Sequence, residues 1–253
     1  MKDKIKLILC DLDDTLMTSR KEVLMKTREA LLECSRRGIK IGYVTIRSPR
    51  KTAIFTKGLP CDCLANYNGA LIRVKDRIIE NASISHEIGI KLIQTLKEEY
   101  PGLGIGAYFE PLCYNHEEIR RIDSQELTDY TLFQVPPYDF QRIRIVPGND
   151  KLDLSRFATE ELSYTVTVRG SIIITHPRAN KENAVRRIME YLGLKASEVL
   201  SFGDDTVDIG MLQASGTGVA MGNAVQELKD VADYVTMSNE ENGIGEYLNR
   251  FIL

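Results

Sequence analysis

The stretch Ile5-Lys-Leu-Ile-Leu-Cys-Asp-Leu-Asp-Asp-Thr15 decides the fold class. Its first half, Ile5 to Cys10, is short and nearly continuously apolar, which is typical of a strand that is covered on both faces. A second run of this kind extends from residue 39 to 44, and the segment between the two has helical spacing. The order strand, helix, strand predicts a parallel α/β sheet, in which ligands bind beyond the carboxyl ends of the strands.

The boundaries of the first helix are predicted from its flanking residues. Ser19 followed by Glu22 has the spacing of a capping box, and Gly38 follows two arginines as a C-terminal glycine does. A second helix is expected near Pro49 and a third strand over residues 62–65. The last third of the chain repeats this alternation, with helices expected at 180–192, 205–214, 224–231 and from 243, and strands at 199–202, 218–221 and 234–236.

The middle of the chain has a different texture. It carries one helical segment, 86–99, and alternating segments at 141–146 and 164–168, which indicate antiparallel strands. We therefore predict an α/β protein with a Rossmann-like parallel-sheet core, residues 1–82 and 178–253, and an inserted α+β cap domain, residues 83–177.

Acidic residues follow two of the predicted strands. Asp11 and Asp13 follow the first, and Asp204 and Asp208 follow the strand at 199–202. Two carboxylates about 4 Å apart repel by about 4 kcal/mol at an effective dielectric constant near 20, so a cation is expected between the two clusters. Mg²⁺ prefers oxygen ligands and keeps positions for water and phosphate. Helix capping and solvated turns would explain either cluster alone, but the equivalent positions of both favour a metal site.

A lysine and a threonine occupy further positions near the strand ends. Lys181 lies at the start of a predicted helix, where a cation opposes the helix dipole, so an anionic site nearby would explain it. Thr45 follows the second strand directly. In isolation, each of the two would be an ordinary surface or turn residue.

Composition excludes several classes of protein. The 253 residues carry 33 basic and 36 acidic side chains, a formal charge of −3, which gives no general attraction to nucleic acid or anionic membranes. We find no apolar run of about 18 residues and no signal peptide, and expect a cytoplasmic protein without membrane association. The five cysteines are odd in number and scattered, which indicates free thiols: Cys10, Cys34, Cys61, Cys63 and Cys113. We expect Cys61 and Cys63 to pack within a strand.

In this order, the motifs resemble those of the haloacid dehalogenase-like hydrolases, and in particular the Cof-type phosphatases with a large inserted cap. Asp11-Leu-Asp-Asp-Thr15 resembles the DxDxT motif of the family, and Thr45 its second-motif hydroxyl. Further matches are the lysine motif, the acidic motif and a downstream glycine segment: Asn180-Lys-Glu182, Gly203-Asp-Asp-Thr-Val-Asp-Ile-Gly-Met-Leu212 and Gly218-Val-Ala-Met-Gly-Asn-Ala224.

The resemblance implies a Mg²⁺-dependent phosphoric monoester hydrolase that acts on a small phosphorylated metabolite, such as a sugar phosphate. Asp11 would be the nucleophile that forms an aspartyl-phosphate, and Asp13 the general acid and base. The remaining roles it implies are metal ligation by Asp11, the Asp13 carbonyl, Asp204 and Asp208, phosphate binding by Thr45, Ile46 and Lys181, and a substrate entrance at Asn68 and Gly69.

Two positions depart from the family pattern. Ile46 stands where glycine is common, and a β-branched residue does not readily adopt a positive φ. Val207 stands where asparagine is common and offers no polar side-chain atom. These departures suggest a slow or Mg²⁺-demanding enzyme.

Other functions stay open beside hydrolysis. They are a phosphosugar mutase and a low-activity phosphate-ligand binding or regulatory protein. A signalling phosphoacceptor is disfavoured, because such a protein would need neither Asp13 nor an insert. The insert arginines are expected on a solvated strand face rather than against a second anionic group of the substrate: Arg120, Arg121, Arg142 and Arg144.

Overall fold

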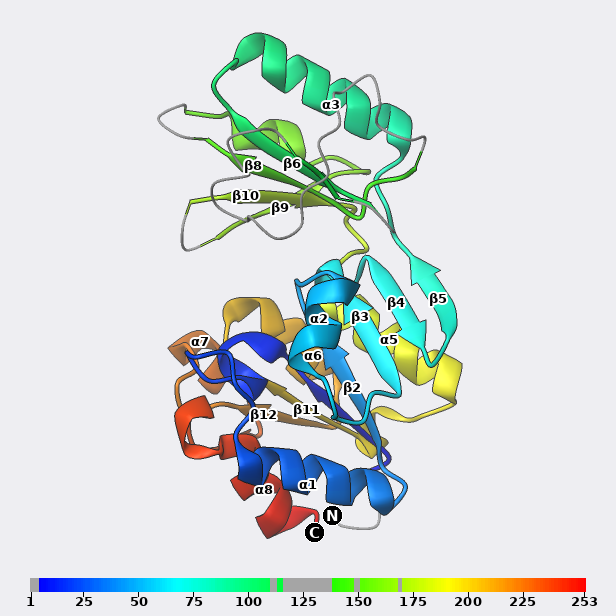
Figure 1. Ribbon diagram of the computed structural model, residues 1–253, viewed down its shortest axis with the longest axis vertical. Helices are drawn as coiled ribbons and strands as arrows, with labels where there is room; N and C mark the ends of the chain where they lie inside the picture. The colour runs from blue at the N-terminus through cyan, green and yellow to red at the C-terminus, as the bar shows by residue number, and fades with distance from the viewer. Residues whose placement is uncertain (1–4, 110–112, 116–137, 148–150, 168–169) are drawn as a thin grey trace. The chain divides into compact units, whose positions relative to one another are not determined.

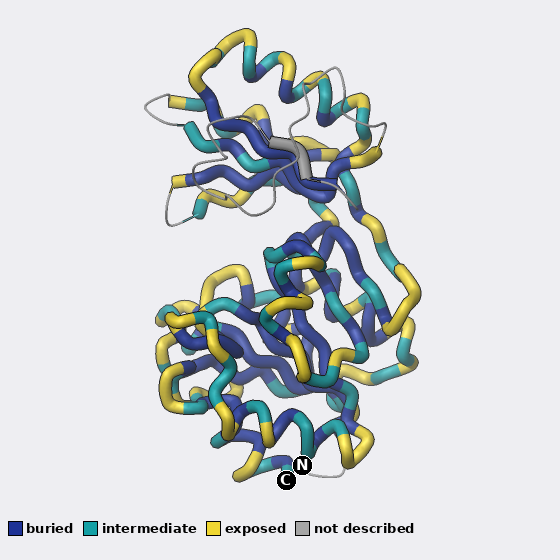
Figure 2. The backbone as a smooth tube through the Cα atoms, viewed as in Figure 1, coloured by how far each residue is buried: buried dark blue, intermediate teal, exposed yellow. Residues whose placement is uncertain are grey.

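The computed structural model describes residues 5–109, 113–115, 138–147, 151–167 and 170–253 (Figure 1). They form two compact units. The core unit comprises Met1–Glu80 and Asn180–Leu253, and the insert unit comprises Asn81–Ala179. Each unit has its own buried interior (Figure 2).

The core unit is built on an eight-stranded sheet in the order β13-β12-β11-β1-β2-β3-β4-β5. The pairs from β13 to β3 are parallel, and β3 pairs with β4 antiparallel. The strands are β1 Leu7–Cys10, β2 Lys40–Val44, β3 Cys63–Asn66, β4 Leu71–Val74, β5 Arg77–Asn81, β11 Val199–Gly203, β12 Thr217–Ala220 and β13 Tyr234–Val235.

The helices of the core unit connect and cover these strands. Helices α1 and α8 lie side by side, as do α5 and α6 (Figure 1). All four residues of β1 are buried, which explains its continuous apolar sequence. The helices are α1 Met25–Arg36, α2 Pro49–Phe55, α5 Lys181–Leu192, α6 Ile209–Ala214, α7 Gln226–Lys229 and α8 Gly243–Phe251. The α/β class and the Rossmann-like parallel core are confirmed.

The insert unit is a five-stranded antiparallel sheet in the order β7-β6-β8-β10-β9. Ile93 and Leu96 of α3, His86–Glu99, belong to one apolar cluster with Ile143 of β8. The strands are β6 Gly104–Tyr108, β7 Cys113–Asn115, β8 Arg142–Val146, β9 Ser163–Val166 and β10 Ile172–Thr175.

The predicted start of the first helix is wrong. Helix α1 begins at Met25, and no side chain caps it. Residues 18–22 form a turn instead, in which the Thr18 hydroxyl accepts the Glu22 N–H at 3.3 Å and Lys21 has a φ of 63°. The preceding threonine, and not Ser19, therefore makes the local side-chain hydrogen bond.

Two further expectations need correction. Arg142 is only 9% exposed, and its guanidinium lies 4.0 Å from the centre of the Tyr108 ring, so it does not lie on a solvated face. Arg144 donates to the Ser171 hydroxyl, while residues 120 and 121 lie outside the described residues.

The expected packing of two cysteines in one strand holds for Cys63 only. Cys61 precedes β3 and is exposed, whereas Cys63 is buried.

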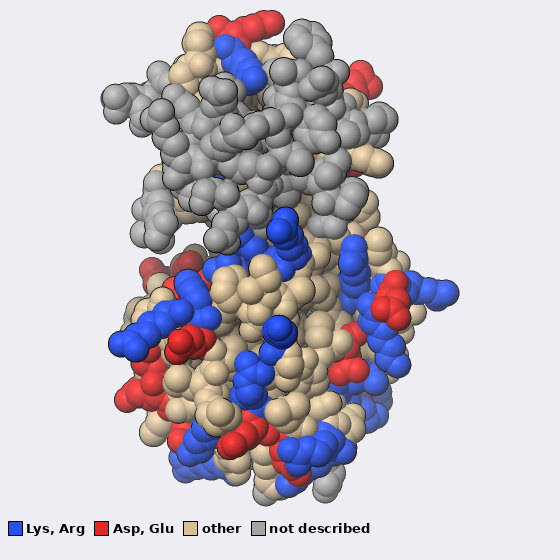
Figure 3. Space-filling model, in the orientation of Figure 1, with Lys and Arg blue, Asp and Glu red and all other residues tan. Residues whose placement is uncertain are grey.

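The surface of the core unit carries both signs of charge. Lysine and arginine side chains alternate with acidic ones over its described residues on the face in Figure 3. Among the described helices, none combines the length and apolar character that crossing a bilayer requires.

Candidate active site

The candidate site lies at the carboxyl ends of three neighbouring parallel strands. Cys10, the last residue of β1, pairs in register with Phe202 of β11 and with Tyr43 of β2. The strands therefore end nearly level, and the residues that follow them, Asp11, Thr45 and Asp204, lie at one edge of the sheet. The N–H of Asp11 continues the ladder by donating to the Phe202 carbonyl at 3.0 Å.

Lys181 joins two of the acidic residues. Its Nζ lies 2.6 Å from Asp11 Oδ1 and 2.6 Å from Asp208 Oδ1, and all three side chains are buried. The N-cap Asn180 fixes the start of α5 by accepting the Asn183 N–H at 2.8 Å. Burial opposes the charged form of Lys181, but the two carboxylates outweigh it and raise the pKa of the ammonium.

The acidic residues form a compact oxygen cluster. One carboxylate oxygen each from Asp11, Asp204 and Asp208 lie within 4.8 Å of one another, an arrangement that can hold a metal ion. Such a set of oxygen donors suits a hard divalent cation.

The pKa values report the electrostatic cost of this cluster. Burial raises the pKa of Asp11 well above its ordinary value, and Asp208 and Asp204 add to the shift while Lys181 opposes it. Burial also raises the pKa of Asp204 to about 7, although the Thr15 hydroxyl donates to its carboxylate at 2.5 Å. Full ionisation of the three carboxylates is therefore unfavourable, because they are buried and a single ammonium offsets their charge.

Backbone groups hold Asp208 at the start of the next turn. Its Oδ2 accepts the N–H groups of Asp204 and Asp205 at 3.1 and 3.2 Å. The fit around it is tight, because a Cβ added to Gly203 would lie 2.6 Å from the Asp208 Cβ. Glycine at the end of β11 therefore leaves room for this carboxylate.

Asp13 has different partners. Arg47 donates from Nε to Asp13 Oδ2 and from Nη2 to Oδ1, both at 2.6 Å, and Lys21 Nζ lies 2.9 Å from Oδ1. Burial alone would raise the pKa of Asp13, but these two cations outweigh it and lower the pKa. The carboxylate lies outside the three-acid cluster, which leaves only the backbone of Asp13 for the metal role expected of it.

The sequence motifs did not indicate Arg47 and Lys21 as partners of Asp13. Arg47 follows the second-motif threonine by two residues, which was the one available signal. Lys21 lies in the turn where a helix start was expected, so nothing in the sequence pattern pointed to it.

Backbone N–H groups of Arg47 and Asn68 contact Thr45. The Thr45 hydroxyl accepts the Arg47 N–H at 3.2 Å, and the Thr45 carbonyl accepts the Asn68 N–H at 2.9 Å. Gly69 has a φ of 99°, and a Cβ there would lie 2.6 Å from the Asn180 carbonyl oxygen. The turn at 67–69 thus packs directly against the start of α5, where Lys181 lies.

The two positions that depart from the family pattern cause no visible backbone strain. Ile46 is not among the described residues with positive φ, so the strain expected at this position is absent. Val207 is 39% exposed and lies in the 3₁₀ turn Thr206–Asp208.

Comparison with known proteins gives one consistent family. The family model of haloacid dehalogenase-like hydrolases matches residues 8–248. The chain is 27% identical to a putative phosphatase of Haemophilus influenzae, covering 94% of this chain and 95% of the relative. It is 26% identical to the 5-amino-6-(5-phospho-D-ribitylamino)uracil phosphatase YcsE of Bacillus subtilis, covering 98% of this chain and 96% of that protein.

A solved structure agrees with the fold. The structure of a haloacid dehalogenase-like hydrolase from B. subtilis superposes with a TM-score of 0.85 at 24% identity, covering 98% of this chain and all of that one. The likeness extends through both units of the chain.

Proposed function

The chain belongs to the haloacid dehalogenase-like hydrolases, and from that membership we propose that it is a metal-dependent phosphatase of small phosphorylated metabolites. The observation that carries the proposal is the buried contact of Lys181 with Asp11 and Asp208, beside Asp204, at the end of the parallel strands. A phosphorylated polyol or sugar is the favoured substrate class, since YcsE, named for a phosphoribityl compound, matches nearly the whole chain.

Asp11 is proposed as the nucleophile. Its carboxylate oxygen attacks the phosphorus of the ester, the bond from phosphorus to the leaving oxygen breaks, and an aspartyl-phosphate forms. Water then attacks that phosphorus, and the bond to Asp11 breaks to release inorganic phosphate. Lys181 holds Asp11 Oδ1, which fixes the carboxylate for attack and offsets its charge against the incoming phosphate.

Asp13 is proposed as the acid and base of the two steps. It gives a proton to the leaving alkoxide and then takes one from the attacking water. Arg47 and Lys21 favour its charged form, which suits the second step. For the first step, the approach of an anionic phosphate would raise the pKa of Asp13 and allow protonation.

We propose Mg²⁺ as the cation of the acidic cluster. When bound, Mg²⁺ would neutralise charge on the phosphate oxygens. The ligands would be the carboxylates of Asp11 and Asp204 and the carbonyl of Asp13. Both Asp208 oxygens already accept hydrogen bonds, from Lys181 on one side and backbone N–H groups on the other, so we assign Asp208 to positioning Lys181 and orienting water.

The phosphate group would bind near Thr45. The Thr45 oxygen accepts the Arg47 N–H, so its own hydroxyl proton is directed to another acceptor, and we propose a phosphate oxygen. The Ile46 N–H and Lys181 would hold the other oxygens, and Asn68 and Gly69 would border the entrance.

A generic aryl phosphate tests this function. Turnover should require a divalent cation, stop with chelator and be lost in Asp11→Asn. A matched control is Asp205→Asn, which changes an exposed neighbouring acid outside the three-acid cluster. Activity that survives Asp11→Asn would exclude the covalent mechanism, and stabilisation by sugar phosphates without turnover would indicate a binding protein instead.

A further inference from the structure

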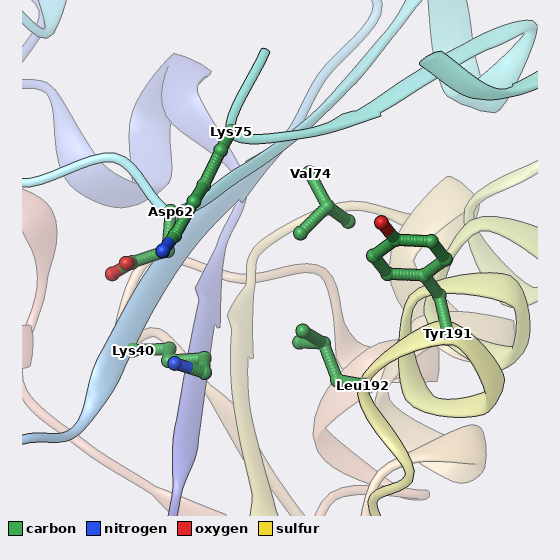
Figure 4. A pocket seen from close by; sticks show the side chains of 6 residues that line it. All are labelled: Lys40, Asp62, Val74, Lys75, Tyr191 and Leu192. Atoms are coloured by element: carbon green, nitrogen blue, oxygen red, sulfur yellow. The ribbon is translucent and has the colours of Figure 1, made fainter. Parts of the chain in front are cut away.

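A pocket opens at the opposite end of the strands from the acidic cluster. It has a volume of about 250 Å³ and is lined by Lys40, Asp62, Val74, Lys75, Tyr191 and Leu192 (Figure 4). Lys40 begins β2, whereas Thr45 follows the end of that strand. Likewise α5 begins with Lys181 and ends with Leu192, about 18 Å of helix. The pocket is therefore separate from the candidate active site.

The walls of the pocket differ in polarity. Val74, Tyr191 and Leu192 lie on one side, and Lys40, Asp62 and Lys75 lie on the other (Figure 4). Val74 is 6% exposed, so it forms a buried floor, while Tyr191 is 45% exposed. An apolar body and a polar group on one small molecule would match these two walls.

The polar wall has an excess of positive charge. Among the described residues, no carboxylate oxygen lies within the 4.0 Å ion-pair distance of either Lys40 or Lys75. Asp62 is already engaged, since its Oδ2 accepts the Ile41 N–H at 2.9 Å. Two ammonium groups against one carboxylate leave a net charge of +1 at the pocket.

The position of Lys75 is fixed by the backbone. Its N–H donates to the Asp62 carbonyl at 2.8 Å, and its φ is 52°. Glycine would adopt this conformation without strain, whereas lysine adopts it at a cost. The turn thus places the Lys75 backbone beside the pocket, and the exposed side chain is one of those that line it.

We propose that this pocket binds a small organic anion, with one carboxylate or phosphate group between Lys40 and Lys75 and an apolar body against Val74, Tyr191 and Leu192. The volume is slightly below the range of about 300–1,000 Å³ of drug-sized ligands, which limits the ligand to a body such as a single ring. The proposal does not depend on the phosphatase function.

Titration with benzoate, followed by amide NMR of the full chain, tests the proposal. We expect saturable shifts at Val74, Lys75 and Leu192 with a Kd on the order of 1 mM, and smaller shifts at Lys181. Benzyl alcohol, which has the ring without the charge, should bind several-fold more weakly. Binding without saturation, or tighter binding of benzylamine than of benzoate, would overturn the proposal.

Substitutions of the charged residues at the pocket should change the Kd for benzoate in opposite directions. Lys40→Met and Lys75→Met should each raise the Kd for benzoate about three- to five-fold, while Lys57→Met, an exposed lysine elsewhere, should leave it unchanged. Asp62→Asn keeps an acceptor for the Ile41 N–H but removes the negative charge, so it should lower the Kd. A higher Kd in Asp62→Asn, or equal effects of all three lysine variants, would show that the pocket is not an anion site.

Discussion

The substitution Asp204→Asn should stabilise the metal-free protein at alkaline pH. Burial raises the pKa of Asp204 from 3.8 to about 7. Between these two pH values, Asp204 is therefore protonated in the folded state and ionised in the unfolded state. The free energy of unfolding therefore falls as pH rises from 3.8 through 7. At 1.36 kcal/mol for each pKa unit, the ionised carboxylate costs about 4 kcal/mol above pH 7, reduced by its partial exposure to roughly 2–4 kcal/mol.

Asparagine cannot ionise, and it retains an oxygen that accepts the Thr15 hydroxyl. About six tenths of this cost develops between pH 5 and pH 8, so the advantage of Asp204→Asn over the natural chain should grow by about 1–2.5 kcal/mol between these values. For a chain of this size that corresponds to a rise in Tm of roughly 2–10 °C.

Thermal unfolding with chelator at the two pH values measures this difference. Adding Mg²⁺ at pH 8 should raise the Tm of the natural chain but not that of Asp204→Asn. Asp205→Asn is the matched control, because the Asp205 side chain is exposed and caps Thr206 through an oxygen that asparagine keeps. An advantage that does not change with pH, or a variant less stable at pH 8, would refute the electrostatic account of this cluster.

Three further predictions concern the partners of the acidic residues. Lys181→Met should lower the free energy of unfolding at pH 8 by about 3–5 kcal/mol in urea titrations, because two buried carboxylates lose their counter-ion; an unchanged value would contradict the proposed charge balance. Arg47→Met should raise the pKa of Asp13. As pH is lowered, the hydrolysis of the phosphoenzyme should therefore begin to slow at a higher pH in the variant than in the natural chain, because the base becomes protonated earlier; identical pH profiles would exclude this coupling. Val207→Asn should lower the Mg²⁺ concentration for half-maximal turnover, and an equal concentration would show that the missing asparagine is unimportant.

The sequence was sufficient for the parts of the fold that depend on local pattern. A continuous apolar run identified β1, and parallel strands that end level bring Asp11 and Asp204 together without further information. The start of α1 was mispredicted because Thr18, rather than Ser19, forms the local hydrogen bond, and both choices satisfy the same short-range chemistry. Local patterns do not distinguish such neighbours.

Side-chain contacts between segments far apart in the sequence could not be predicted from local patterns. Arg47 reaches Asp13 across 34 positions, and Arg142 is buried against Tyr108 by strand pairing in the insert unit. A charged residue in an alternating strand is ordinarily exposed, and only the tertiary structure shows that an aromatic ring covers this one.

Burial of β1 stabilises the fold but destabilises the charged residue that follows the strand. Its four buried apolar residues stabilise the sheet, whereas the next residue, Asp11, places a carboxylate near two others in the same low-dielectric region. Lys181 offsets part of that repulsion, but one ammonium faces three acids, and the pKa of Asp204 stays raised, chiefly by burial and further by the Asp208 charge. The divalent cation proposed for this cluster would supply positive charge that the protein groups do not, and would favour the ionised carboxylates over their protonated forms.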